Sequence, residues 1–254
     1  MPRYVLEVMY DGTKFHGSQI QGETPTVQLE LNKILSTILR TPILTYGASR
    51  TDEGVHALCN YYHFDIEDEL KPDFLYKCNA ILSHGLAVKR VCRAVRPDFN
   101  CRFDAIIRTY RYRIYFARNP FLQDRALYYP YRFDSSILNE TAEEIMKCKS
   151  FESFAKRNSQ SKTFTCNILQ SGWEHNGDEL HYVVSANRFL RGMVRGLVGT
   201  QLRIARNKGN ADDLRKIIDA KDSRAAYFDV AGHGLYLEQI TYRENELIQL
   251  QPEL

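Results

Sequence analysis

Apolar and polar residues alternate along four segments of the first hundred residues, namely 4–10, 43–48, 55–64 and 86–95. A period of two is typical of β-strands that bury one face. Two other segments place apolar residues at helical spacing: one begins at Thr24-Pro25, with Thr24 as its N-cap, and the other begins near Pro72. The pattern therefore predicts the order β-α-β-β-α-β.

The rest of the chain predicts the same order with one added helix. Strands are expected at 105–116, 164–173, 180–185 and 235–241, and the middle two form a hairpin around Asn176-Gly177. Helices are expected after Asp134, from about Arg188 to Arg206, and after Asn210.

These repeated orders predict an α+β fold of two ferredoxin-like β-α-β-β-α-β halves, residues 1–103 and 104–254. We expect their sheets to join edge to edge into a mixed, mainly antiparallel sheet with a central cleft. No connection between the halves is rich in Gly, Pro or Ser, which favours packed rather than tethered halves.

The basic residues are unevenly distributed, although the net charge is only +3. Nine Lys or Arg residues lie between Lys89 and Arg118 against two acids, and six lie between Ser185 and Lys208 with no acid. This segregation indicates a basic face of the kind that binds nucleic acid. Chance clustering on a solvated surface is the alternative.

The six cysteines, at positions 59, 78, 92, 101, 148 and 166, form no Cys-x-x-Cys pair and match no zinc spacing. The N-terminus has neither an apolar signal segment nor a small-residue cleavage site, and no apolar run is long enough to span a membrane. We therefore expect reduced thiols and a cytoplasmic protein without a membrane partner.

The polar segment from Ala48 to His56 joins two expected strands and holds several reactive side chains. Arg50 precedes Asp52 by two residues, and His56 follows it by four. Strand ends are common positions for catalytic groups. The alternative is a hairpin loop whose Asp and Gly only satisfy turn geometry.

Aromatic and basic residues interleave on the expected strand from Arg108 to Tyr115. Alternation places Tyr110 and Tyr112 on one face and Arg111 on the other. Such a strand suits stacking on bases and pairing with phosphates. A half-buried strand with a solvated arginine face explains the pattern equally well.

Arginines and glycines recur together in the segment from Asn187 to Gly199. On the expected helix, Arg188, Arg191 and Arg195 share one face, and three glycines, at 192, 196 and 199, lie close to it. Because glycine weakens a helix, these positions indicate close approach of another backbone, either a packed protein strand or RNA.

Two further segments hold candidate contacts, the loop 11–19 with Lys14 and Gln19, and the aromatic-flanked Arg102. The chain has no Gly-rich phosphate loop and no His-rich cluster, so no nucleotide cofactor and no metal is expected. A metal-dependent carboxylate nuclease is disfavoured, because Glu53 is the only acid beside Asp52.

Five motifs in order resemble the tRNA pseudouridine synthase A family across nearly the whole chain. They are Tyr-Asp-Gly at 10–12 with Gln19 nearby, Arg-Thr-Asp-x-Gly-Val-His at 50–56, Arg-x-Tyr-x-Tyr at 108–112, Phe-x-x-x-Met-Val-Arg-x-x-Val-Gly at 189–199, and Gly-Leu-x-Leu at 234–237.

The resemblance implies two ferredoxin-like halves forming a homodimer that binds tRNA across both subunits. It implies isomerisation of uridine to pseudouridine at positions 38 to 40 of the anticodon stem-loop, without metal or cofactor. It also implies that Asp52 is the catalytic aspartate, that Tyr110 stacks on the target base, and that Arg195 pairs with Asp52. Whether Asp52 attacks C1′ or removes the C2′ proton stays open.

The residues expected to contact RNA are Lys14, Gln19, Arg50, His56, Arg102, Arg108, Arg111, Arg188 and Arg191.

The chain also departs from the family pattern. Ser18 replaces Trp, Ile20 a basic residue, Ser49 Gly, Asn100-Cys101 His-Ala, and Ala231-Gly232 part of an Ala-Pro-Ala run. No departure removes a catalytic group, but several lie in loops expected to touch RNA. An RNA-binding or RNA-folding protein of the same fold without activity is the alternative function.

Overall fold

The computed structural model describes residues 1–156 and 162–250, which divide into two compact units. Unit 1 comprises Met1–Ile106 and Leu237–Leu254, and unit 2 comprises Ile107–Tyr236. The division follows residue 106, three residues beyond the expected boundary, and the segment from 237 onward groups with unit 1 instead of unit 2. The mixed α+β class is confirmed.

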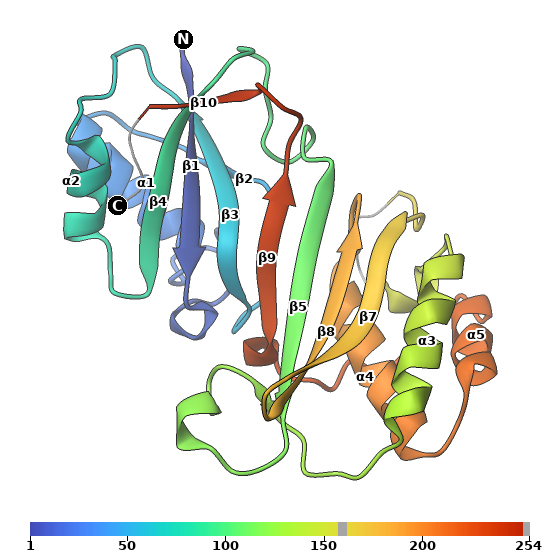
Figure 1. Cartoon of the computed structure of the whole chain (residues 1–254). Coiled ribbons are helices and arrows are strands. Elements are labelled where there is room, and N and C mark those ends of the chain that lie inside the picture. The colour runs from blue at the N-terminus through green and yellow to red at the C-terminus, as the bar shows by residue number, and fades with distance from the viewer. Residues whose placement is uncertain (157–161, 251–254) are drawn as a thin grey trace. The chain divides into compact units, whose positions relative to one another are not determined.

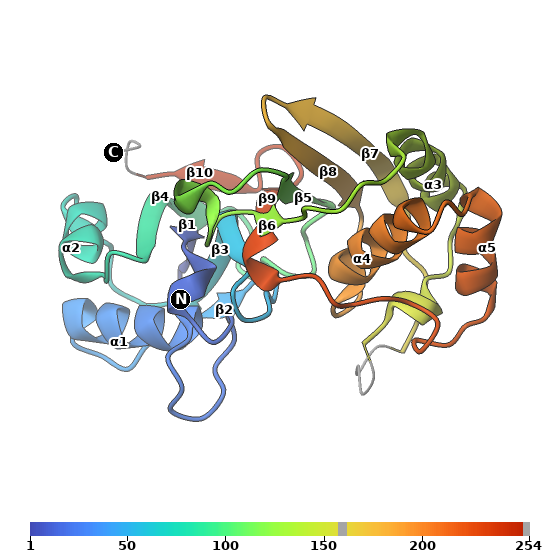
Figure 2. The same ribbon diagram turned by 90° about the horizontal axis from the view of Figure 1, so that it is seen from below.

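Unit 1 contains an antiparallel sheet in the order β10-β4-β1-β3-β2 (Figure 1). Its elements along the chain are β1 (Arg3–Tyr10), the 3-10 turn η1 (Gly12–Lys14), α1 (Val27–Leu39), β2 (Tyr46–Gly47), β3 (His56–Asp65), α2 (Phe74–Ile81), β4 (Leu86–Ala94) and β10 (Leu247–Gln249). Residues 237–241 of β9 (Leu235–Thr241) also belong to unit 1. Leu31 and Leu35 of α1 and Phe74 and Cys78 of α2 are buried, and both helices lie on one side of the strands (Figure 2).

Unit 2 contains the strands β7-β8-β5-β6, of which only the β5–β6 pair is parallel. Its elements are β5 (Ile107–Tyr115), η2 (Pro120–Leu122), β6 (Leu127–Tyr128), α3 (Ser135–Lys147), η3 (Glu152–Phe154), β7 (Ile168–Asn176), β8 (Glu179–Ala186), α4 (Met193–Arg206), α5 (Ala211–Asp219) and η4 (Gly232–Gly234). Helix α3 packs on β7 and contacts α4 and α5. Asp134 and Asn210 cap α3 and α5 as predicted, and Asn210 forms a capping box with Asp213.

Two of the element boundaries in unit 1 that differ from the prediction have a clear cause in the structure. Helix α1 begins after Thr26, whose hydroxyl accepts from the Leu29 N–H, because the Pro25 carbonyl is engaged by the His16 N–H outside the helix. The strand expected at 43–48 shortens to Tyr46–Gly47, because the Thr45 N–H and hydroxyl both donate to Asn32 Oδ1 of α1.

The expected helix from Arg188 begins only at Met193. Gly192 has φ of 74°, a left-handed conformation that a continuous helix does not allow. Arg188 and Arg191 therefore precede the helix and share no helical face with Arg195, which corrects the prediction.

None of the six cysteines, all within the described residues, forms a disulfide. No helix in the described ranges is long and apolar enough to cross a membrane.

Candidate active site

The loop between β2 and β3, which carries Asp52, is fixed at its start by strand β3. The Ala48 N–H donates to the Tyr61 carbonyl at 2.8 Å. Asn60 brackets the next residue, because its Nδ2 donates to the Ser49 carbonyl at 2.9 Å and its Oδ1 accepts from the Ser49 N–H at 3.3 Å. The buried amide of Asn60 thus sets the direction in which the loop leaves the sheet.

Thr51, the residue before Asp52, is held on three sides. Its N–H donates to Ser18 Oγ at 2.8 Å, and its carbonyl accepts from the Ser18 N–H at 3.1 Å. Its hydroxyl lies 2.9 Å from the Tyr10 hydroxyl, which accepts from Asn60 Nδ2 at 3.1 Å. Burial raises the pKa of Tyr10 to about 12, so Tyr10 keeps its proton and can donate it to Thr51.

Asp52 itself is half-buried and opens a tight turn. The Val55 N–H donates to the Asp52 carbonyl at 3.2 Å, and Gly54 supplies the left-handed conformation with φ of 77°. Gly12 of η1 packs against the end of this turn so closely that an added Cβ would lie 2.1 Å from the Val55 carbonyl oxygen. The main chain around Asp52 is therefore constrained from both ends.

His56 was expected to contact RNA, but its side chain is only 3% exposed. Its Nδ1 accepts from the Gly12 N–H at 3.2 Å and lies 3.3 Å from Asp11 Oδ1. The ring joins the start of β3 to the Asp11-Gly12 turn. The structure thus places His56 inside unit 1, where it holds neighbouring main chain and exposes little surface for an RNA contact.

Tyr110 lies on β5 opposite Val184 of β8 and is 7% exposed. Its ring meets Phe189 edge to face, with centroids 5.1 Å apart. Arg108, on the same strand face, is also buried and donates to the Asn187 carbonyl at 2.9 Å. Arg108 was expected to contact RNA, whereas here it anchors the segment that carries Phe189.

Arg195 lies on the first turn of α4, and its Nε donates to the Val230 carbonyl at 2.9 Å. The glycines of this helix lie against the same segment. An added Cβ would be 2.8 Å from the Phe228 ring at Gly196 and 2.3 Å from the Tyr227 carbonyl oxygen at Gly199. The sequence left open whether protein or RNA approaches these glycines. In the structure, the protein segment 227–230 packs against Gly196 and Gly199.

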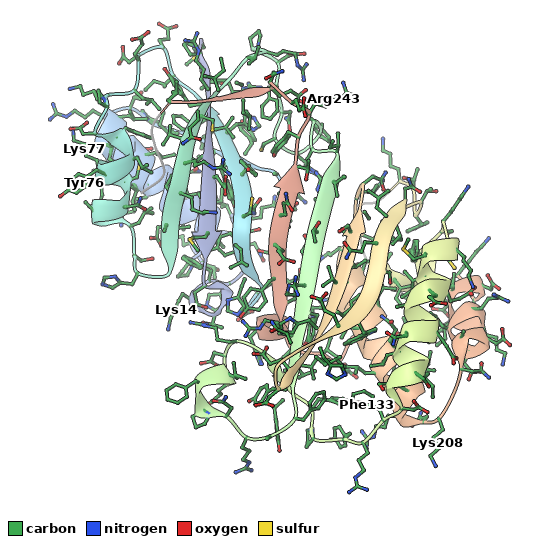
Figure 3. The ribbon with its side chains drawn as sticks, in the orientation of Figure 1. Lys14, Tyr76, Lys77, Phe133, Lys208 and Arg243 are labelled. Carbon is green, nitrogen blue, oxygen red and sulfur yellow. The ribbon has the colours of Figure 1, made fainter. Side chains whose placement is uncertain are left out.

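The remaining expected RNA contacts occupy both units. Lys14, Gln19, Arg50 and Arg102 are exposed in unit 1, and Figure 3 shows Lys14 of η1 near the end of β1. In unit 2, Arg111 contacts Glu174 and lies 3.2 Å from His181 Nδ1, whereas Arg188 donates to Thr163 Oγ1 at 2.9 Å. Arg191 is exposed just before α4.

Ser18, Tyr10 and Asn60 hold the loop, yet sequence reasoning assigned none of them this function. Asn60 carried the clearest signal, since it is a polar residue inside an apolar strand. Among the described residues, no three His, Cys, Asp or Glu side chains gather as metal ligands.

Comparisons with known proteins identify the family. A family model described as tRNA pseudouridine synthase matches residues 149–243. The chain is 38% identical over 247 residues to the tRNA pseudouridine synthase A of Parabacteroides distasonis, covering 96% of this chain and 97% of the relative. It is 40% identical over 248 residues to the tRNA pseudouridine synthase A of Bacteroides fragilis, covering 94% of this chain and 96% of the relative. It is 31% identical over 250 residues to the tRNA pseudouridine synthase A of Staphylococcus aureus, covering 97% of this chain and 93% of the relative.

The chain belongs to the tRNA pseudouridine synthase A family. It is accordingly a pseudouridine synthase. The family model covers helix α4 with Arg195, whereas Asp52 and Tyr110 lie N-terminal to the matched residues.

Proposed function

We propose that this protein converts uridine to pseudouridine in tRNA, at positions 38 to 40 of the anticodon stem-loop, and that Asp52 is its catalytic residue. One observation carries the proposal: relatives named tRNA pseudouridine synthase A match almost the full length of the chain at 31% to 40% identity. The rigidly held loop around Asp52 supports the same residue, because a catalytic carboxylate must be positioned before its substrate arrives.

The reaction breaks the bond between ribose C1′ and uracil N1, turns the base, and joins C1′ to C5. The C5 proton is lost and N1 gains one, so the reaction neither oxidises nor reduces the substrate. The Asp52 carboxylate starts it by attack on C1′ or by removal of the C2′ proton. The uridine must first leave the RNA stack, which is the general requirement for enzymes that act on a base.

Tyr110 and Arg195 act with Asp52 in this proposal. The Tyr110 ring, supported edge to face by Phe189, stacks on the flipped base, and its phenol oxygen takes up the C5 proton directly or through water. Arg195 holds the Asp52 carboxylate in its ionised form and orientation, since a guanidinium does not deprotonate and binds carboxylates in a planar geometry. The Val230 carbonyl already orients the Arg195 side chain.

The proposal includes the assembly expected from the family. The protein acts in the cytoplasm as a homodimer that binds one tRNA across both subunits, in a cleft between two ferredoxin-like halves. The strand order β4-β1-β3-β2 in unit 1, with both helices on one side, supports the ferredoxin-like description of that half.

Purified protein should form pseudouridine in unmodified tRNA transcripts. We expect the product at positions 38 to 40, mapped by a chemical that modifies pseudouridine and stops reverse transcription. Product at other positions would correct the proposed target. Tight tRNA binding without product in any transcript would favour the RNA-binding alternative.

Replacing Tyr110 with phenylalanine should keep the stacking surface and remove the phenol. We expect tRNA affinity to change less than about threefold and the single-turnover rate to fall roughly 10²-fold, the usual contribution of one proton-transfer group. Tyr112→Phe is the matched control, because the Tyr112 hydroxyl donates to the Ala231 carbonyl within unit 2. A wild-type rate for Tyr110→Phe would limit Tyr110 to stacking.

A further inference from the structure

A small pocket in unit 1 borders the start of the Asp52 loop. Ser49 and Arg50 line it, but Asp52 does not. Its volume is about 170 Å³, below the ~300–1,000 Å³ of sites for drug-sized ligands. A single flat ring is therefore a more suitable occupant than a whole nucleoside.

The polar groups of this pocket match the edge of a nucleobase. Asn100 Oδ1 accepts from the main-chain N–H groups of Arg102 and Phe103, at 3.0 and 3.4 Å, so its Nδ2 is fixed as a donor. Neither this Nδ2 nor the amide of Gln19 makes a hydrogen bond to any described residue. Side-chain amides of this kind pair with bases through one donor and one acceptor.

The pocket also has aromatic and cationic walls. Tyr46 is 57% exposed although its ring stacks on His63 with centroids 5.3 Å apart, and Phe103 is 76% exposed. Large exposed aromatic rings beside a basic groove are typical of proteins that stack unpaired bases. Arg50 and Arg102 add the positive charge that phosphates of the same strand require.

Three of the seven positions at which this chain departs from the family pattern line the same pocket. Ser18, Ser49 and Asn100 all line it. Cys101, another departure, adjoins the pocket residue Tyr46, because its Sγ donates to the Tyr46 carbonyl at 2.9 Å. Departures that are far apart in the sequence therefore lie at one place, where the serine and amide side chains at 18, 49 and 100 supply polar groups to the lining.

We propose that this pocket binds one unpaired RNA base, distinct from the uridine that reacts, and that Gln19 and Asn100 recognise its edge. The proposal rests on the proposed function, because the RNA is the tRNA substrate. The base stacks on Tyr46 or Phe103, and its binding determines which RNA loops the enzyme accepts.

The test compares synthetic tRNAs in which each unpaired nucleotide in turn lacks its base. Wild-type protein should lose affinity at one position by more than roughly 25-fold, since two neutral hydrogen bonds contribute about fivefold each and the lost stacking adds to them. The Gln19→Ala/Asn100→Ala variant should bind intact tRNA roughly 25-fold more weakly, and loss of the base at that position should cost it roughly 25-fold less than it costs wild type, because only the stacking is left to lose. Gln21→Ala is the matched control, because Gln21 is exposed two residues away and does not line the pocket.

Two results would overturn the proposal. Equal losses for wild type and the double variant at every abasic position would show that no base occupies the pocket. Unchanged binding of intact tRNA by the double variant would assign the pocket to a different ligand, such as a protein segment. Pseudouridine formation in intact tRNA is measured in parallel, so failure of the proposed function is seen separately as unmodified uridine with wild-type protein.

Discussion

Asp52→Asn is expected to reduce the single-turnover rate of pseudouridine formation by at least about 10⁴-fold, the loss typical when a group that acts directly on the substrate is removed. Asparagine keeps the size of the side chain but cannot attack C1′ or accept the C2′ proton. The main-chain hydrogen bonds of the loop, from Val55 to the Asp52 carbonyl and between Thr51 and Ser18, do not require the carboxylate. Folding and tRNA affinity should therefore change little.

Glu53→Gln is the matched control for this experiment. Glu53 is the other acid of the same loop. Its side chain is 72% exposed and lies 3.2 Å from His16 Nδ1. We expect its variant to react within about threefold of wild type, since a contact between two exposed side chains contributes little. Substantial turnover by Asp52→Asn, measured with enzyme in excess, would assign the chemistry to another residue. An equal loss in Glu53→Gln would indicate that the loop tolerates no change of charge.

Much of this fold was predicted from short sequence patterns, because strand alternation and helix caps depend only on residues close together in the chain. Alternation located β4 to within one residue, and the polar residues Asp134 and Asn210 identified two helix starts, since a cap needs only its own first turn. The Asp52 loop was found in the same way, from reactive residues gathered between two strands.

The errors arise where distant contacts override these patterns. Thr45 hydrogen-bonds to a helix residue 13 positions earlier, and that contact shortened an expected strand. Gly192 delays the start of the helix expected from Arg188, because the sequence does not distinguish a glycine with a left-handed φ from a glycine inside a helix. The grouping of 237–254 with unit 1 depends partly on β10, whose pairing with β4 joins residues more than 150 positions apart.

In the site, too, residue type alone did not predict which side chains are buried by contacts with distant segments. His56 and Arg108 have the side chains of RNA-binding residues, but both are buried and bonded to the main chain of neighbouring segments. Conversely, Ser18 appeared only as a departure from the family. In the structure it binds both main-chain groups of Thr51, directly beside the proposed catalytic residue.

Gly12→Ala should show how strongly the rate depends on the position of this loop. An added Cβ would lie 2.1 Å from the Val55 oxygen, 2.3 Å from the Val55 carbonyl carbon and 2.8 Å from the Gly54 carbonyl carbon. All three atoms belong to the main chain, so the clash can be relieved only by moving one main-chain segment away from the other, the turn that follows Asp52 or η1 itself. Overpacking of this kind costs about 3 kcal/mol, which corresponds to a melting temperature roughly 6–12 °C lower for a chain of this size.

The catalytic consequence of Gly12→Ala should exceed its effect on binding. A displacement of about 1 Å in a reacting group can reduce a rate roughly 10²-fold, whereas the charges that attract tRNA are unchanged. We therefore expect the single-turnover rate to fall about 10²-fold and tRNA affinity to fall less than about threefold, measured well below the melting temperature. Gly172→Ala is the control, because a Cβ at Gly172 meets no atom within 4 Å. If Gly12→Ala melts earlier but reacts at the wild-type rate, the contact between Gly12 and the turn stabilises unit 1 without positioning Asp52.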